Sequence, residues 1–89
     1  MSASVSTLPD GNLSLELGEE DLERLSEIID ETYGPPDVEQ GVTLTTYTIA
    51  GAEFLFANEW GDPCLRSRDA AGHAILLDLA QRLGWGGAP

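Results

Sequence analysis

The chain has no lysine, and it has only one cysteine and one histidine among its 89 residues. The single Cys64 cannot form an internal disulfide, which excludes a disulfide-stabilised scaffold and favours a reducing compartment. One cysteine and one histidine are too few for a structural zinc site. The chain also lacks an apolar run of the roughly 20 residues that span a membrane, and its N-terminus lacks the features of a signal peptide. We therefore expect a cytoplasmic protein.

Positive charge is scarce throughout. Four arginines stand against 16 aspartates and glutamates, for a formal net charge of −12. The imbalance is concentrated in residues 1–40, which hold eleven acids and one arginine, whereas residues 41–89 hold five acids and three arginines. Such a charge distribution argues against direct binding to nucleic-acid phosphates or to anionic membranes. It favours encounter with positively charged proteins.

Signals of catalysis or of cofactor binding are equally few. The chain has no phosphate-binding loop and no dinucleotide fingerprint, and residues 58–69 do not supply the regularly spaced oxygens of a calcium loop. Asp69 stands one helical turn before His73 and can reach it, but no nucleophile motif surrounds Cys64. We interpret Cys64 as a buried strand residue and His73 as a surface or boundary residue. We predict that the protein is not an enzyme and holds no metal ion and no cofactor.

The length predicts a single domain. Residues 1–11 are small and polar and end in the turn signal Pro-Asp-Gly, so we expect a flexible tail there. Residues 12–85 would form one α+β domain, and residues 86–89 a second flexible tail. Residues 12–17 alternate polar side chains with leucines, which indicates either a short strand or an extended lead-in to the first helix.

The clearest element is a helix between Gly18 and Gly34. Three acids open it, where the helix dipole favours negative charge, and Gly34 followed by two prolines ends it. Apolar residues recur every three or four positions and line one face: Leu22, Leu25, Ile28, Ile29 and Tyr33. The opposite face carries one base, Arg24, and five acids, which are Glu20, Glu23, Glu27, Asp30 and Glu31. Glutamates stand four residues apart on this face, an arrangement that costs about 0.2–0.5 kcal/mol per pair.

Beta-branched and aromatic residues mark strands over residues 42–49 and 52–60, and a tight turn joins them into an antiparallel hairpin. Residues 64–68 are expected to return as a third strand, and residues 70–83 to form a second amphipathic helix. The predicted fold is α+β. It has a three-stranded antiparallel sheet, or a four-stranded one if residues 12–17 join it, with both helices packed on one face.

The order helix, three strands, helix resembles that of double-stranded-RNA-binding domains. Those domains carry lysines at the start of their last helix, where this chain reads Ser67-Arg68-Asp69. The resemblance therefore implies the order of elements alone, and we do not expect RNA binding.

These features favour a small acidic binding protein without catalytic activity. The expected function is that of an inhibitor or antagonist of the nucleic-acid-mimic, anti-defence or immunity type, bacterial or phage-encoded. It would dock on a basic surface of a nucleic-acid-binding protein, nuclease or toxin. The predicted contacts are the five acids of the helix face and Trp60, which stands beside a turn and is of a type enriched at binding hot spots. Alternatively, Trp60 closes the end of the core.

A second hypothesis is a regulatory or scaffolding module that forms a homodimer. Its working surface would be a sheet face or edge with Tyr47, Leu55 and Trp60, and the acids would then serve solvation alone. Arg66 and Arg68 alternate on one strand face and are expected to pair with acids of the first helix or of a second copy.

Overall fold

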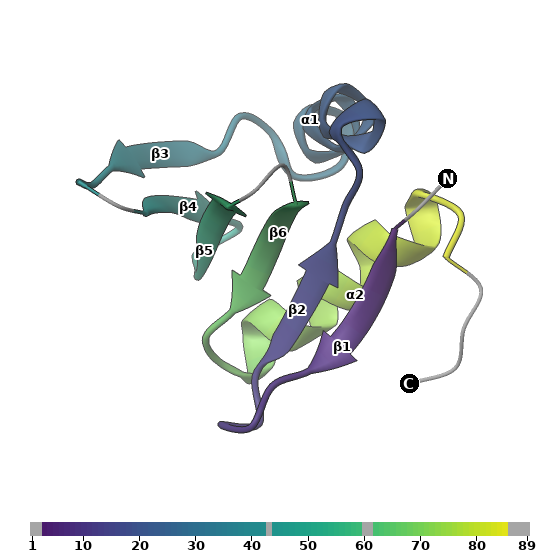
Figure 1. The fold of residues 1–89 in the computed structure, drawn as a ribbon. Coiled ribbons are helices and arrows are strands. Elements are labelled where there is room, and N and C mark those ends of the chain that lie inside the picture. The colour runs from purple at the N-terminus through teal and green to yellow at the C-terminus, as the bar shows by residue number, and fades with distance from the viewer. Residues whose placement is uncertain (1–2, 43, 60–61, 86–89) are drawn as a thin grey trace.

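A computed structural model describes residues 3–42, 44–59 and 62–85 of the chain (Figure 1). Within these residues the elements follow the order β1-β2-α1-β3-β4-β5-β6-α2. All six strands form one antiparallel sheet, in the spatial order β1-β2-β6-β5-β4-β3. The protein therefore belongs to the α+β class, but the prediction of a three-stranded sheet is wrong.

The first hairpin pairs β1 (Ser4–Thr7) with β2 (Leu13–Glu16). β1 lies in the segment for which the sequence predicts a flexible tail. The Pro-Asp-Gly turn closes this hairpin, because the Leu8 amide donates a 2.7 Å hydrogen bond to the Asn12 carbonyl and the Asp10 carboxylate accepts one from the Asn12 amide. A strand as short and polar as β1 shows almost no apolar alternation, so it becomes visible only through its pairing. β2 confirms the strand considered for residues 12–17.

The rest of the sheet contains β3 (Asp37–Gln40), β4 (Thr45–Ile49), β5 (Ala52–Glu59) and β6 (Asp62–Ser67). The β4–β5 hairpin and the return strand β6 confirm the three predicted strands to within a few residues. Ala50 and Gly51 join β4 to β5 with φ angles of 51° and 82°, the sign that a type I′ hairpin turn requires at both positions. β3 falls in a segment for which the sequence predicts no strand, because its exposed, mostly polar residues carry no strand pattern.

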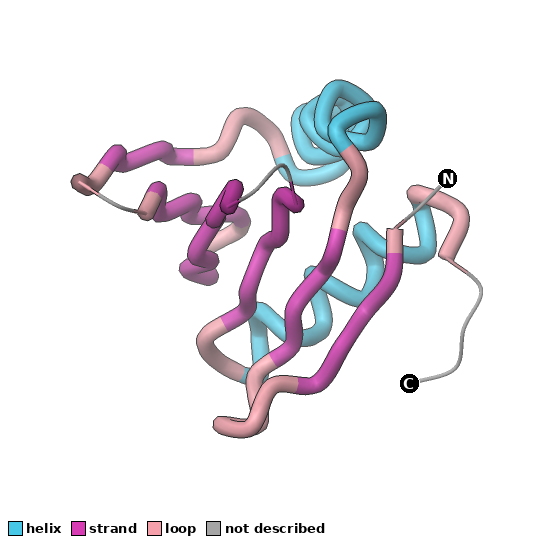
Figure 2. Tube along the Cα trace, in the orientation of Figure 1, coloured by secondary structure: helices cyan, strands magenta, loops and turns pink. Residues whose placement is uncertain are grey.

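Helix α1 (Glu19–Tyr33) leads from β2 to β3, and helix α2 (Ala70–Arg82) follows β6. Both confirm predicted helices. α2 contacts β1, β2, β5 and β6, and α1 packs beside α2 near the end of the sheet (Figures 1 and 2). Because β3 stands between α1 and β4, the order of elements also differs from that of double-stranded-RNA-binding domains.

The strand register assigns the core to the side of the sheet that the helices cover. Buried apolar residues from several strands share this side and meet the apolar faces of both helices; the largest, all 0–2% exposed, are Leu15, Ile49, Phe54, Leu65, Leu76, Leu79 and Leu83. Among the described residues no helix lies on the opposite side, which we call the open face. Its members alternate with the core residues along the strands: Ser14, Glu16, Thr46, Thr48, Glu53, Leu55, Ala57, Cys64 and Arg66.

Candidate protein-binding surface

The rotation of α1 about its axis is set by its apolar side and by its first turn. Leu25, Ile28 and Ile29 are only 5–7% exposed and pack into the core. At the start of the helix the Gly18 amide donates a 3.0 Å hydrogen bond to Asp21 Oδ2, and the Asp21 side chain is buried. From the sequence, Asp21 is predicted only as one of the three acids that favour the helix dipole. Its position three residues after the N-cap is the signal for this capping role.

All five acids predicted to contact a partner lie exposed on the outer side of α1. We call them the acidic face of α1: Glu20, Glu23, Glu27, Asp30 and Glu31. At a rise of about 1.5 Å per residue, the row from Glu20 to Glu31 covers roughly 17 Å of helix. Arg24 is the only base in α1, against seven acids. Glu20 also takes part in an interaction within the chain, so the strongest candidates for contact with a partner are the other four.

The aromatic and apolar residues named for the alternative surface do not come together. Tyr47 is opposite Phe54, and Leu55 is opposite Thr46, so Tyr47 lies on the core side of the sheet and Leu55 on the open face. Their assignment to one working surface is therefore wrong, because neighbouring strands place directly paired residues on the same side. Trp60 lies outside the described residues.

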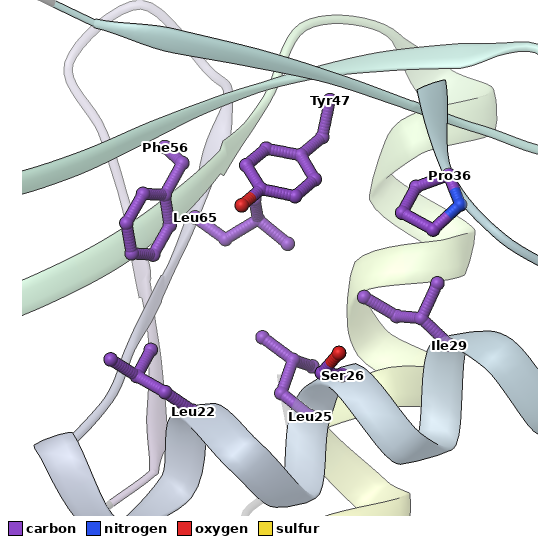
Figure 3. Close-up of a pocket in the computed structure, with 8 residues that line it drawn as sticks. All are labelled: Leu22, Leu25, Ser26, Ile29, Pro36, Tyr47, Phe56 and Leu65. Carbon is purple, nitrogen blue, oxygen red and sulfur yellow. The ribbon is translucent and has the colours of Figure 1, made fainter. Parts of the chain in front are cut away.

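Tyr47 instead lines a pocket of about 230 Å³ between α1 and the sheet (Figure 3). Its ring packs edge-on against Phe56 with the ring centroids 5.8 Å apart. The pocket has an apolar wall from each side, with α1 opposite β4, β5 and β6; its lining residues are Leu22, Leu25, Ser26, Ile29, Pro36, Tyr47, Phe56 and Leu65. α1 thus touches the sheet less closely than α2 does, and it stands partly free of the core.

Arg68 pairs within the chain, with the sheet rather than with α1. It directly follows β6 and lies 3.9 Å from Glu53 of the neighbouring β5, in an exposed ion pair. Arg66 has a buried Nε without a hydrogen-bond partner, and its charge acts on Asp10 in the β1–β2 turn. The pKa of Asp10 lies below its usual value, chiefly because its carboxylate accepts the backbone hydrogen bond of Asn12.

One polar cluster joins the two helices. Tyr33 of α1 donates a 2.7 Å hydrogen bond to Asp78 Oδ2 of α2, and Arg82 Nε donates a 2.8 Å bond to the same oxygen. These bonds, from Arg82 first and then from Tyr33, lower the pKa of Asp78. Partial burial, and then the bond to Asp78, raise the pKa of the Tyr33 hydroxyl. The cluster ties the C-terminal turn of α1 to α2.

The residues considered for catalysis are separated. Cys64 alternates with the core residue Leu65, which places it half-buried on the open face, whereas His73 belongs to α2 on the other side of the sheet. His73 Nε2 lies 3.2 Å from Asn12 Oδ1, and the Asp69 side chain caps α2. The described residues contain no group of three or more histidine, cysteine or acidic side chains placed to hold a metal ion.

Comparisons of the chain with protein-family models, with curated proteins and with solved structures find no match. Neither α1 nor α2, the helices of the described part of the chain, has the length and apolar character needed to cross a membrane. The fold and the surface define a small acidic α+β protein with seven of its 16 acids on one helix.

Proposed function

We propose that the protein is a non-enzymatic inhibitor or antagonist that docks through the acidic face of α1 on a basic surface of a nucleic-acid-binding protein, nuclease or toxin. The observation that carries the proposal is the exposure of four carboxylates, at Glu23, Glu27, Asp30 and Glu31, on one side of a single rigid helix. Glu23, Glu27 and Glu31 follow one another at intervals of four residues, about 6 Å between neighbours on a helix, so they offer regularly spaced negative charge to cationic side chains.

The cost of the arrangement supports a role in binding. Glu23–Glu27 and Glu27–Glu31 are like-charged neighbours, each unfavourable by about 0.2–0.5 kcal/mol. Solvation of a helix does not require this, because bases at alternate positions keep a surface polar and remove the repulsion. A concentrated negative surface steers a positively charged partner toward the helix and raises the rate of association.

The test compares two double variants that have the same net charge but lose their negative charges from different surfaces. The variant E23Q/E27Q and the control E16Q/E53Q each neutralise two exposed acids, the first on α1 and the second on the sheet. The wild-type protein, used as bait in a bacterial lysate at low salt, should retain a basic protein that E23Q/E27Q retains much less and E16Q/E53Q retains fully. The captured protein is then bound to labelled DNA or RNA, which the wild type should displace.

Salt separates this interaction from apolar association. Raising the ionic strength from about 0.05 M to 0.5 M should release the partner, because exposed charges are screened over a few ångströms at high salt. Equal retention by E23Q/E27Q and E16Q/E53Q, or capture that survives high salt unchanged, contradicts docking through the acidic face.

A homodimer through the open face is the second candidate. This face carries Leu55 together with charges of both signs, Arg66 and Arg68 against Glu16 and Glu53. In a two-fold interface each patch meets its own copy, so a patch with charges of both signs can pair with itself. Sedimentation at high micromolar concentration distinguishes the two: a dimer that Leu55→Lys dissociates supports this candidate, and a monomer excludes it.

A further inference from the structure

The outer edge of the sheet at β3 offers a surface distinct from the acidic face. β3 is the terminal strand in the sheet order, and among the described strands it pairs only with β4. Figure 1 shows β3 at the margin of the sheet. Its four residues are all exposed, and Val38 is 50% exposed. In an antiparallel pair the backbone groups of alternate residues point away from the partner strand. The outer side of β3 therefore presents backbone donors and acceptors that a further strand can pair with.

The two edges of the sheet differ. β1, at the other edge, lies against α2, has Val5 packed against the core, and contains no charged residue. β3 carries Asp37 and Glu39, which alternate with Val38 and Gln40. Only the β3 edge therefore combines open backbone groups with side chains that select a partner by charge.

The register with β4 places the two acids of β3 on the same side of the sheet. Asp37 and Glu39 are opposite Thr48 and Thr46, whereas Val38 is opposite Tyr47 on the helix-covered side. A strand added to β3 would place every second side chain opposite these acids. Opposite charges across neighbouring strands are favourable and like charges directly opposite are unfavourable. A second copy of β3, paired antiparallel about Asp37, Val38 or Glu39, sets acid against acid, so the edge disfavours self-association.

We propose that β3 binds an extended basic segment of a partner protein by strand addition. Lysine or arginine at alternate positions of that segment lies opposite Asp37 and Glu39, and an apolar residue lies beside Val38. The proposal rests on the proposed function in taking the partner to be basic. Its site is separate from α1, so each can fail without the other.

The test uses the isotope-labelled full chain and a synthetic acetylated hexapeptide of alternating lysine and valine. Titration followed by NMR should shift the backbone amides of residues 37–40, and two alternate amides of β3 should exchange more slowly with solvent when the peptide is bound. A control peptide with proline in place of each valine keeps the charge but loses every second backbone amide donor and fits a strand poorly. It should bind at least tenfold more weakly.

Two charge variants with equal net charge locate the site. D37N/E39Q should weaken binding of the lysine–valine peptide by about 2- to 30-fold, the range for two cross-strand charge pairs. E23Q/E27Q should weaken binding of this peptide by less than about twofold, because the acids of α1 attract it only at long range. Thermal unfolding of each variant, followed by circular dichroism, confirms that the fold is kept.

Several results overturn strand addition at β3. Strand addition is contradicted if the proline peptide binds equally well, if the shifts are confined to α1, or if neither peptide binds. Shifts confined to α1 that E23Q/E27Q abolishes would leave the acidic face as the basic-partner site. Slower exchange at β3 with no effect of E23Q/E27Q would support β3 even where the lysate capture and displacement experiment fails. A dimer in sedimentation that D37N/E39Q strengthens would show that a second copy takes the edge.

Discussion

The two helices have similar lengths and opposite characters. α2 packs across four strands, and its buried leucines Leu76 and Leu79 have no exposed surface. α1 keeps slight exposure at each buried residue, has a pocket between it and the sheet, and carries seven acids against one arginine. α2 contains a single acid, Asp78, and that acid is engaged by Tyr33 and Arg82.

The difference indicates a division of roles. The packing of α2 forms the core, so its sequence is constrained mainly by volume and shape. α1 needs only one apolar stripe and one cap to hold its position, which leaves its outer side free to carry charge that weakens the helix.

Truncation of a core leucine should cost more in α2 than in α1. Leu79→Ala should lower the free energy of unfolding by about 3–5 kcal/mol, because the side chain is enclosed on every side. Leu25→Ala should cost about 2–3 kcal/mol, since Leu25 already borders a pocket and loses fewer contacts. Urea denaturation at pH 7 measures both values. A larger loss for Leu25→Ala would show that α1 is the principal core helix.

The starts of the two helices should also differ. Asp69→Ala removes an exposed N-cap that accepts the Gly72 amide at 2.7 Å, and should cost about 0.5–2 kcal/mol. Asp21 is only 1% exposed, and Asp21→Ala removes the carboxylate that accepts the Gly18 amide. This substitution should lower the free energy of unfolding by about 1–3 kcal/mol. Asp21→Asn keeps an acceptor oxygen and should recover part of the loss. Equal stability of Asp21→Ala and wild type would rule out this cap as the anchor of α1.

How much the sequence predicts depends on which interaction forms each element. Both helices and the β4–β5 hairpin are predictable, because periodicity, caps and turn residues are local signals. β1 and β3 are not, because a stretch of four residues with a single valine becomes a strand only when a neighbouring strand supplies hydrogen bonds. The exposed acids of α1 follow from helical periodicity. The edge at β3 is not predictable, because an edge is defined by the strand order, which no local pattern contains.

Asp78 should contribute stability that depends on pH. Its pKa in the folded protein lies below the 3.8 of an unperturbed carboxyl, so its contribution is full above about pH 4 and is lost as the pH falls through the lowered pKa. The carboxylate is partly exposed, so Asp78→Asn should cost no more than about 1 kcal/mol at pH 7. The difference from wild type should be constant between pH 5 and 8 and should shrink below pH 4. A difference that persists unchanged at pH 2.5 would contradict an ionic contribution.

Replacing a carboxylate by an amide should stabilise the protein on the acidic face of α1, whereas the same replacement at Asp78 should destabilise it. Glu27→Gln relieves repulsion with Glu23 and Glu31 and should raise the free energy of unfolding by about 0.4–1 kcal/mol at low salt. Glutamate and glutamine have nearly equal helix propensity, so the gain reports charge alone and should disappear at about 1 M salt. Urea denaturation at both salt concentrations measures it, with Asp78→Asn as the comparison. A loss of stability would mean that the acids of α1 serve the fold. A gain would mean that the chain keeps Glu27 at a cost to stability, as expected where the carboxylate serves a partner.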